Sequence, residues 1–451
     1  MSTRTLYSAA AALALLCGGA ESFAETAASR DEIRAVVSEV IADAQTRSSL
    51  LEGGAGGGHD GKLFYLADAS GNFRLNIGGL AQFRYSLNFR DDQDGGPNAA
   101  PNRGNDDFES GFQTRRTRLW FTGNIVKPEL TYYIQSDFNR AGGTFDLLDA
   151  YVAYKFECGA SLKWGQYKMP FMREELISDW KQLAAERSSV NTVFTQDRSQ
   201  GIELGYKTDD IRLAVAFNDG FASRNSEFGS VNDEQGDFGF TKGGGESDYG
   251  VTGRLEWKVA GDWKQFDDFT STPESGYACM LGAAAHIEGS ANDIGVDDDG
   301  DGVLDDRGDT RLGAWTLDAS VEGDGWNLFA AGVGYHTHTS LKDAGRESTD
   351  DYGLVVQGGF FLPDTDWELF ARYDAIFQDS DRDLGDTDET FDTVTVGTNY
   401  YLAGSTARFT FDVQWFLDES TDLMTQNRGN NFLATTEENE VNFRLQFQLV
   451  F

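Results

Sequence analysis

The chain has 451 residues and a strongly acidic balance, with 74 Asp and Glu against 37 Lys and Arg and a formal net charge of −37 at pH 7. Beyond its N-terminal region, no stretch approaches the ~18–20 continuous apolar residues of a transmembrane helix. These features exclude a helical membrane protein. They leave a large water-soluble β protein or a membrane β-barrel.

Residues 1–24 are typical of an export signal. Arg4 supplies a positive charge, Ala9 to Leu16 an apolar run, and Ser22-Phe23-Ala24 a small-x-small cleavage site. We therefore expect the mature chain in an oxidising compartment. The sequence does not decide whether Cys158 and Cys279 pair there. The outward position expected for Cys279 favours two unpaired thiols.

Residues 25–52 have a four–three apolar spacing, carried by Ile33, Val37, Val40 and Ala44. This pattern predicts a short amphipathic helix with coiled-coil character. Two interpretations remain open, a surface helix and a periplasmic oligomerisation segment. Residues 53–70, which begin with a glycine-rich run, are expected to be a linker.

From residue 71 to residue 451 apolar and polar side chains alternate with period two, the pattern of a strand with one face in an apolar medium. Each segment is long enough for a tilted strand to cross a bilayer, which takes ~9–11 residues. We predict sixteen strands, at 75–89, 112–125, 130–139, 146–156, 160–168, 200–207, 210–218, 248–260, 276–287, 311–322, 325–336, 352–362, 367–377, 391–402, 406–417 and 441–451.

The connections alternate in length along the chain. Short polar turns such as 208–210 and 323–325 follow the even-numbered strands, and long segments such as 90–111 and 169–199 follow most odd-numbered ones. The stretch 261–275 is unusually long for the short-turn side. An even strand count with short periplasmic turns and long external loops is typical of bacterial outer-membrane barrels. The sequence therefore predicts an all-β transmembrane antiparallel barrel of about 16 strands with a short N-terminal helical segment.

Charges avoid the apolar face, where Arg or Lys would cost ~2–4 kcal/mol at the bilayer midplane. The inward positions carry both signs with a slight basic surplus, which indicates a polar interior. Each of these charges can either hold the barrel wall in an ion pair or contact a solute. They are Arg74, Arg84, Arg116, Arg118, Lys155, Lys163, Arg212, Arg254, Lys258, Arg372, Arg408 and Arg444, with Asp137, Asp149, Glu203, Glu256, Asp318, Glu322, Glu368, Asp374 and Asp412.

Several motifs in order resemble the phosphate-selective porin O and P family. They are Phe112-Gln-Thr-Arg-Arg-Thr-Arg-Leu119, Gln135-Ser-Asp137, Asp149-Ala-Tyr-Val152, Gly165-Gln-Tyr-Lys-Met-Pro-Phe171 and Gly201-Ile-Glu-Leu-Gly205, with the terminal Phe451. The resemblance implies a trimer of sixteen-stranded barrels. It also implies that the third external loop, here 169–199, folds into the lumen as a constriction.

The candidate pore residues combine inward charges with positions that match the family. They are Arg74, Arg84, Arg115, Arg116, Arg118, Asp149, Lys163, Lys168, Glu174 and Arg187. Strict alternation would turn Arg115 toward lipid, so we expect either a β-bulge there or a place at the outer rim.

An acidic stretch within residues 293–309 matches the front half of a calcium loop. Asp297, Asp299, Asp301 and Asp305 take its first, third, fifth and ninth positions, with Gly302 at the sixth. The twelfth position is Gly308 where such loops have a bidentate Glu, so an unliganded acidic loop is the alternative. No cofactor is required by any other motif.

The chain contains no nucleophile elbow and no phosphate-cradling glycine loop, so we expect no enzymatic activity. We predict an outer-membrane porin that lets small hydrophilic solutes or ions diffuse passively, with anions such as phosphate among the candidates. Its expected partners are outer-membrane lipid, these solutes and two further copies in a homotrimer, and no nucleic acid. The alternative is a structural barrel that links the membrane to a periplasmic layer through its N-terminal helix.

Overall fold

The computed structural model describes residues 56–61, 63–90, 108–138, 143–221, 223–226, 247–296, 306–340, 348–380, 389–419 and 439–451. The predicted export signal, the helix at 25–52 and the four calcium-loop aspartates lie outside these residues. The chain separates into two units, Met1–Gly56 and Gly57–Phe451, and the second contains the barrel.

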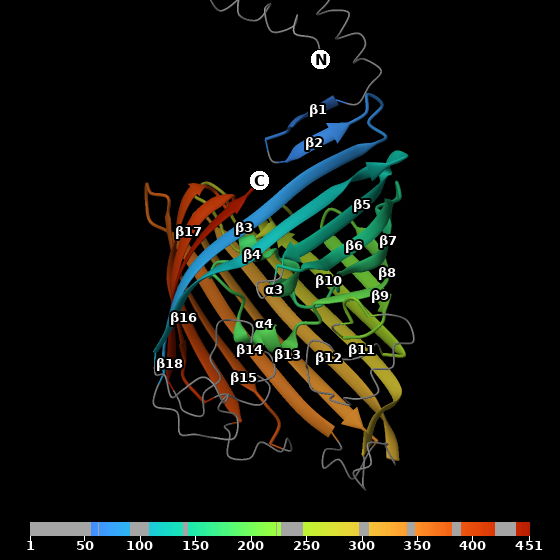
Figure 1. Ribbon diagram of the computed structural model, residues 1–451, viewed down its shortest axis with the longest axis vertical. Helices are drawn as coiled ribbons and strands as arrows, with labels where there is room; N and C mark the ends of the chain where they lie inside the picture. Colours follow the sequence, from blue (N-terminus) through green and yellow to red (C-terminus); the bar gives the residue numbers. More distant parts are fainter. Residues whose placement is uncertain are drawn as a thin grey trace, which may run out of the picture. The chain divides into compact units, whose positions relative to one another are not determined.

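Sixteen antiparallel strands, β3 to β18, follow one another around a barrel, and pairing of β18 with β3 closes it (Figure 1). Closure leaves no open sheet edge, which is the condition for crossing lipid with strands. The predicted barrel and strand count are confirmed. The strands are β3 (Arg74–Phe89), β4 (Phe108–Ile125), β5 (Lys127–Phe138), β6 (Phe145–Lys155), β7 (Ala160–Lys168), β8 (Arg198–Lys207), β9 (Ile211–Asn218), β10 (Tyr249–Ala260), β11 (Ala278–Val296), β12 (Asp306–Gly323), β13 (Trp326–Thr339), β14 (Ser348–Phe361), β15 (Trp367–Phe377), β16 (Thr390–Ala403), β17 (Ala407–Phe416) and β18 (Glu440–Val450).

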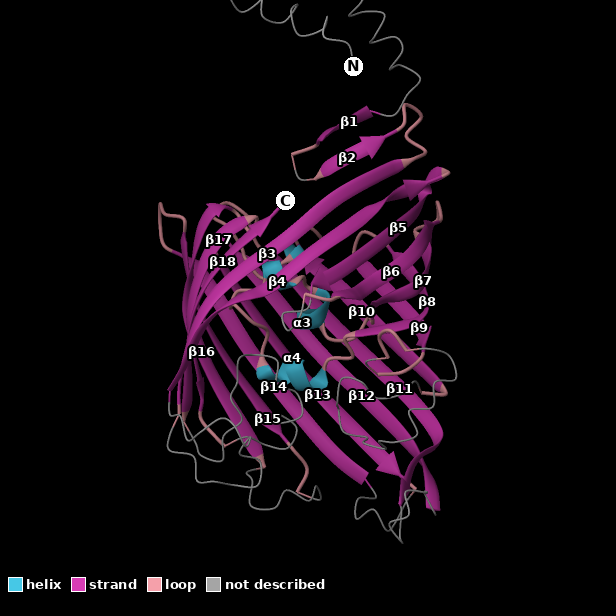
Figure 2. Ribbon diagram, in the orientation of Figure 1, coloured by secondary structure: helices cyan, strands magenta, loops and turns pink. Residues whose placement is uncertain are grey.

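The range predicted as a linker contains two short strands, β1 (Gly56–His59) and β2 (Phe64–Ala67). β1 pairs with β2, and β2 pairs with the start of β3 (Figure 2). This part of the 53–70 segment is therefore ordered by the first barrel strand.

The last residue takes part in closing the barrel. Phe451 and Gly79 exchange two backbone hydrogen bonds of 2.8 and 3.0 Å. A Cβ at Gly79 would lie 2.3 Å from the Phe451 ring, so only glycine leaves room for this ring.

The two faces of the strands differ as the alternation predicts. On β18, Asn442, Arg444 and Gln446 are buried inside, whereas Leu445 and Leu449 are exposed on the outside. An apolar outer face and a polar inner face are what a bilayer-spanning barrel requires.

Strand lengths are uneven around the barrel. β7 and β9 have 9 and 8 residues, whereas β11 and β12 have 19 and 18. The β11–β12 hairpin continues well beyond the predicted ranges on its long-loop side, where Val296 still pairs with Asp306.

Neither Cys158 nor Cys279 forms a disulfide. Among the described residues, no helix is long and apolar enough to cross a bilayer.

Candidate functional site: the interior of the barrel

The connection between β7 and β8 folds inside the barrel. It contains α3 (Arg173–Leu176), a 3-10 turn η1 (Asp179–Lys181) and α4 (Ser189–Phe194), and almost all of its side chains are buried. Figure 2 shows both α-helices within the ring of strands. We call residues 169–197 the inner loop.

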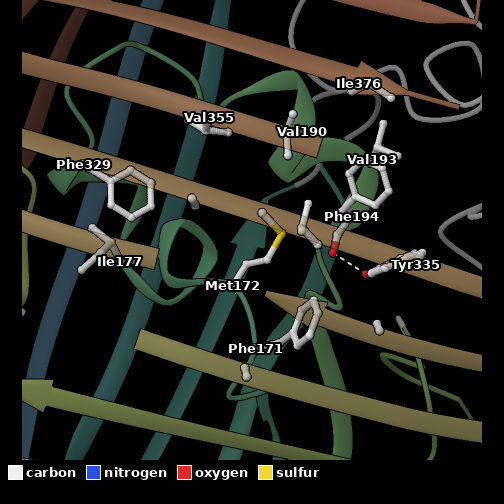
Figure 3. Packing of buried hydrophobic residues seen from close by; sticks show 14 of the residues in the cluster. Phe171, Met172, Ile177, Val190, Val193, Phe194, Phe329, Tyr335, Val355 and Ile376 are labelled. Atoms are coloured by element: carbon white, nitrogen blue, oxygen red, sulfur yellow. Dashed lines mark hydrogen bonds between the residues drawn. The ribbon is translucent and has the colours of Figure 1, made fainter. Parts of the chain in front are cut away.

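Apolar packing fixes one side of the inner loop. Phe171, Met172, Val190 and Phe194 join a buried cluster with inward-facing side chains of β13 to β17 (Figure 3). The Phe194 ring lies edge-on to Tyr335 at 5.0 Å, and the Tyr335 hydroxyl donates to the Phe194 carbonyl. This half of the interior is therefore a packed core.

Local polar contacts shape the loop around α4. Ser188 caps the helix by accepting a 2.9 Å hydrogen bond from Asn191 N. The Glu174 carboxylate accepts from both Ser188 N (2.7 Å) and Ser188 Oγ (2.6 Å). Glu174 therefore joins α3 to the start of α4.

Two buried carboxylates fasten the inner loop to β3 and β4. Glu186 pairs with Arg84 (2.7 Å), Arg116 (2.7 Å) and Arg115. Asp179 pairs with Arg116 (3.4 Å) and also with Arg118 and Arg187. We call these seven residues the arginine–carboxylate cluster.

The electrostatics of the cluster favour its ionised form. Burial opposes ionisation of Asp179 and Glu186. The surrounding guanidinium groups outweigh that effect and hold the pKa of each carboxyl well below its usual range. The cluster is therefore charged and paired at neutral pH.

A β-bulge brings Arg115 into the cluster. Gln82 pairs with Arg116 and Phe83 pairs with Thr114, which leaves Arg115 as the extra residue of β4. The bulge turns its side chain inward. Of the two expectations for Arg115, the bulge is confirmed.

The inner loop also contacts the far wall. Arg372 Nη1 donates to Glu186 O (2.9 Å), and Ala185 N donates to Asp412 (2.9 Å). Asn399 Nδ2 donates to Leu183 O (3.0 Å). The loop thus crosses the interior from β7 and β8 to β15, β16 and β17.

The remaining predicted pore residues lie at several levels. Asp149 pairs with Arg198 (3.0 Å), Lys163 with Glu203 (2.8 Å), and Lys168 with Glu175 (3.3 Å). Arg74 lies apart at the short-turn end, paired with Asp60. Wall or loop ion pairs therefore engage the predicted charges, and only Arg84, Arg115, Arg116, Arg118 and Arg187 converge in one cluster.

Solvent reaches only one half of the inner wall. Inward-facing side chains of β12 to β18 are buried almost without exception. On β5, β7 and β9, by contrast, Asp137, Lys163 and Arg212 remain 22%, 26% and 33% exposed. Among the described residues, partly exposed inward-facing side chains therefore occur along β4 to β10, interspersed with buried ones such as Arg116, Glu203 and Arg254.

Sequence reasoning missed the apolar inner wall and one inward-facing cation of the open side. The signal for the wall was present, because β13 and β14 carry apolar side chains on both faces, as in Leu328-Phe329 and Val355-Val356. Lys207, inward-facing opposite Arg212, was also overlooked.

The model of the phosphate-selective porin O and P family matches residues 83–449. An anion-selective porin from Comamonas acidovorans is similar in structure, at 11% identity, with a TM-score of 0.52 and coverage of 84% of this chain and 99% of that one. Salmonella typhi OmpF, solved with daunomycin, is 14% identical, with a TM-score of 0.52 and coverage of 84% of this chain and 99% of that one. A trimer form of Vibrio cholerae OmpT is 12% identical, with a TM-score of 0.50 and coverage of 84% of this chain and 99% of that one. No curated protein matches the sequence.

Proposed function

This chain belongs to the phosphate-selective porin O and P family and is an outer-membrane porin for passive diffusion of small solutes, and we propose that its solutes pass along the inner wall of β4 to β10. The partial exposure of Lys163 and Arg212, against the burial of the β12–β18 wall, carries this proposal. A porin carries out no reaction, so the expectation of no enzymatic activity is confirmed by family membership.

The charge along this wall favours small anions. Four cations face inward near the short-turn end of β6, β8, β9 and β10: Lys155, Lys207, Arg212 and Lys258. Three acids lie near these four cations: Glu256 at 3.8 Å from Arg212, the exposed Asp210 at 3.9 Å from Lys258, and Asp267, which interacts electrostatically with Lys207. A surplus of cations on a pore wall favours anions, and the family name and the Comamonas relative agree with that preference.

The reversal potential of the purified porin in a planar bilayer, measured across a potassium chloride gradient, tests the anion preference. We expect the sign of an anion-preferring channel, reduced in Lys207→Gln and Arg212→Gln. Lys127→Gln removes one charge at an exposed site at the same end of the barrel and should leave the potential unchanged. A cation-preferring potential in the unaltered protein would contradict the proposal, and block by added phosphate would extend it to that ion.

The outer face of β4 fits a protein partner. Thr114 and Thr117 of β4 point outward there, near Phe112, which is 88% exposed. Hydroxyl groups gain little from lipid but can pair across a subunit interface. We infer that this face forms the contact of a homotrimer, an assembly that Vibrio cholerae OmpT also adopts in its trimer form. A monomeric mass by light scattering in detergent would contradict the inference.

Calcium binding by residues 293–309 is a separate proposal. It rests on the aspartate spacing and on the hairpin geometry, since β11 and β12 bring Val296 and Asp306 together on either side of residues 297–305. Isothermal titration with calcium, compared with Asp297→Asn and Asp301→Asn, tests it. Equal heats in all three proteins would refute it.

A further inference from the structure

One turn at the short-turn end is much longer than its neighbours. Residues 261–277 join β10 to β11, whereas 208–210 and 324–325 suffice elsewhere. The segment includes a 3-10 turn, η2 (Gln265–Asp267). Its Phe266 and Phe269 are buried at 2% and 3% exposure. We call residues 261–277 the connector.

The connector packs on the inner loop. Arg173 Nη2 donates to Phe266 O (2.9 Å), and the Arg173 guanidinium lies 5.8 and 5.4 Å from the Phe266 and Phe269 rings. Phe269 N also donates to Lys181 O (3.3 Å). The two segments therefore meet inside the barrel.

The connector also reaches the walls of the packed half. The Phe269 ring lies 4.8 Å from that of Phe329 on β13. Thr270 Oγ1 and the Tyr401 hydroxyl of β16 are 3.2 Å apart, and Ser271 Oγ donates to Gly323 O (2.7 Å). This side of the short-turn end is thus covered by the connector.

The other side of the connector contacts inward-facing cations of the open half. Trp263 Nε1 donates to Asp209 O (2.8 Å) in the β8–β9 turn. The Arg212 guanidinium stacks on the Trp263 ring at 3.9 Å, with Lys207 and Lys258 each 5.9 Å from it. Cation–π attraction offsets part of the repulsion among these three like charges.

We propose that the connector is a second constriction element, which closes the β12–β16 side of the short-turn end and directs solutes past Lys207, Arg212 and Lys258. In this arrangement Trp263 is a positioning residue that holds the three cations around the passage. The inference rests on the proposed passage along β4 to β10. It adds that selectivity at this end depends on a turn as well as on the barrel wall.

Three variants and a control test the connector in a planar bilayer. Phe266→Ala with Phe269→Ala loosens its packed side, and single-channel conductance should rise at least about twofold as the passage widens. Trp263→Ala should lower the anion preference read from the reversal potential, and Trp263→Phe, which keeps an aromatic face, should restore part of it. Trp367→Ala removes an outward-facing tryptophan at the start of β15 and should change neither quantity.

The outcomes separate the two proposals. If the unaltered protein conducts with an anion preference but the connector variants match Trp367→Ala in both readouts, the connector inference is wrong and the porin passage stands. Trp263 packs on Phe266 but is itself only partly buried. Trp263→Ala therefore removes less buried contact than the double phenylalanine variant, and it decides the matter if that variant does not fold. A silent unaltered protein would overturn both.

Discussion

Replacing Glu186 by Gln removes the central charge of the arginine–carboxylate cluster. The carboxylate is only 2% exposed and pairs with Arg84, Arg115 and Arg116. Glutamine keeps the shape but removes the carboxylate charge that these three guanidinium groups share, although Arg116 keeps its pairing with Asp179. Breaking one partner of a buried ion pair costs about 3–5 kcal/mol, and we expect Glu186→Gln to lower the free energy of unfolding by that amount.

Urea unfolding in lipid vesicles, followed by tryptophan fluorescence, measures this difference. Glu129→Gln removes a carboxylate from an exposed site on β5 and serves as the matched control. Adding Arg115→Gln to Glu186→Gln should recover part of the loss, because it lowers the excess positive charge of the cluster. A Glu186→Gln protein that unfolds within about 0.5 kcal/mol of the control would refute the reasoning.

Further expectations follow from the same contacts. The lowered pKa values of Asp179 and Glu186 mean that their stabilisation is present above the ordinary carboxyl pKa and is lost as pH falls through the lower folded values. The difference in unfolding free energy between the unaltered protein and Glu186→Gln should therefore be constant from pH 8 to about pH 5 and shrink below about pH 4. A difference that disappears at pH 6 would be inconsistent with this. Phe194→Ala should cost about 3–5 kcal/mol in the same unfolding assay because its side chain is fully buried against Tyr335, more than Phe360→Ala on the outer face. Gly165→Ala should lower the yield of heat-modifiable folded barrel, because Gly165 has φ +135° and a Cβ there would lie 2.2 Å from Ala150 O. The control Gly111→Ala should fold normally, since there is open space around Gly111.

The strands could be predicted because one physical rule governs every one of them. Each residue between a lipid face and a polar interior must alternate, so segments such as 367–377 were placed at their true bounds. Strand ends beyond the bilayer follow no such rule. The β11 strand was expected to end at residue 287 and runs to Val296, because outside the lipid pairing can continue with polar side chains on both faces.

The candidate site could be predicted only in part. Inward charge identified Arg84 and Arg116, and the family resemblance added Arg115 and the inner loop. Which acids they meet could not be derived, because Glu186 is 102 residues beyond Arg84 in the chain and only the folded loop joins them. The apolar inner wall around Phe329 was missed because period-two reasoning assigned apolar residues to lipid alone.

The claim that solutes pass along β4 to β10 is tested most directly by blocking that wall with a thiol reagent. In a Cys158→Ser, Cys279→Ser background, Lys163→Cys places a thiol on the open wall and Gln414→Cys places one on the buried wall of β17. Single-channel recording before and after addition of a bulky maleimide should show a loss of conductance for Lys163→Cys and none for Gln414→Cys. Block at Gln414→Cys with an unaffected Lys163→Cys would contradict the proposed passage.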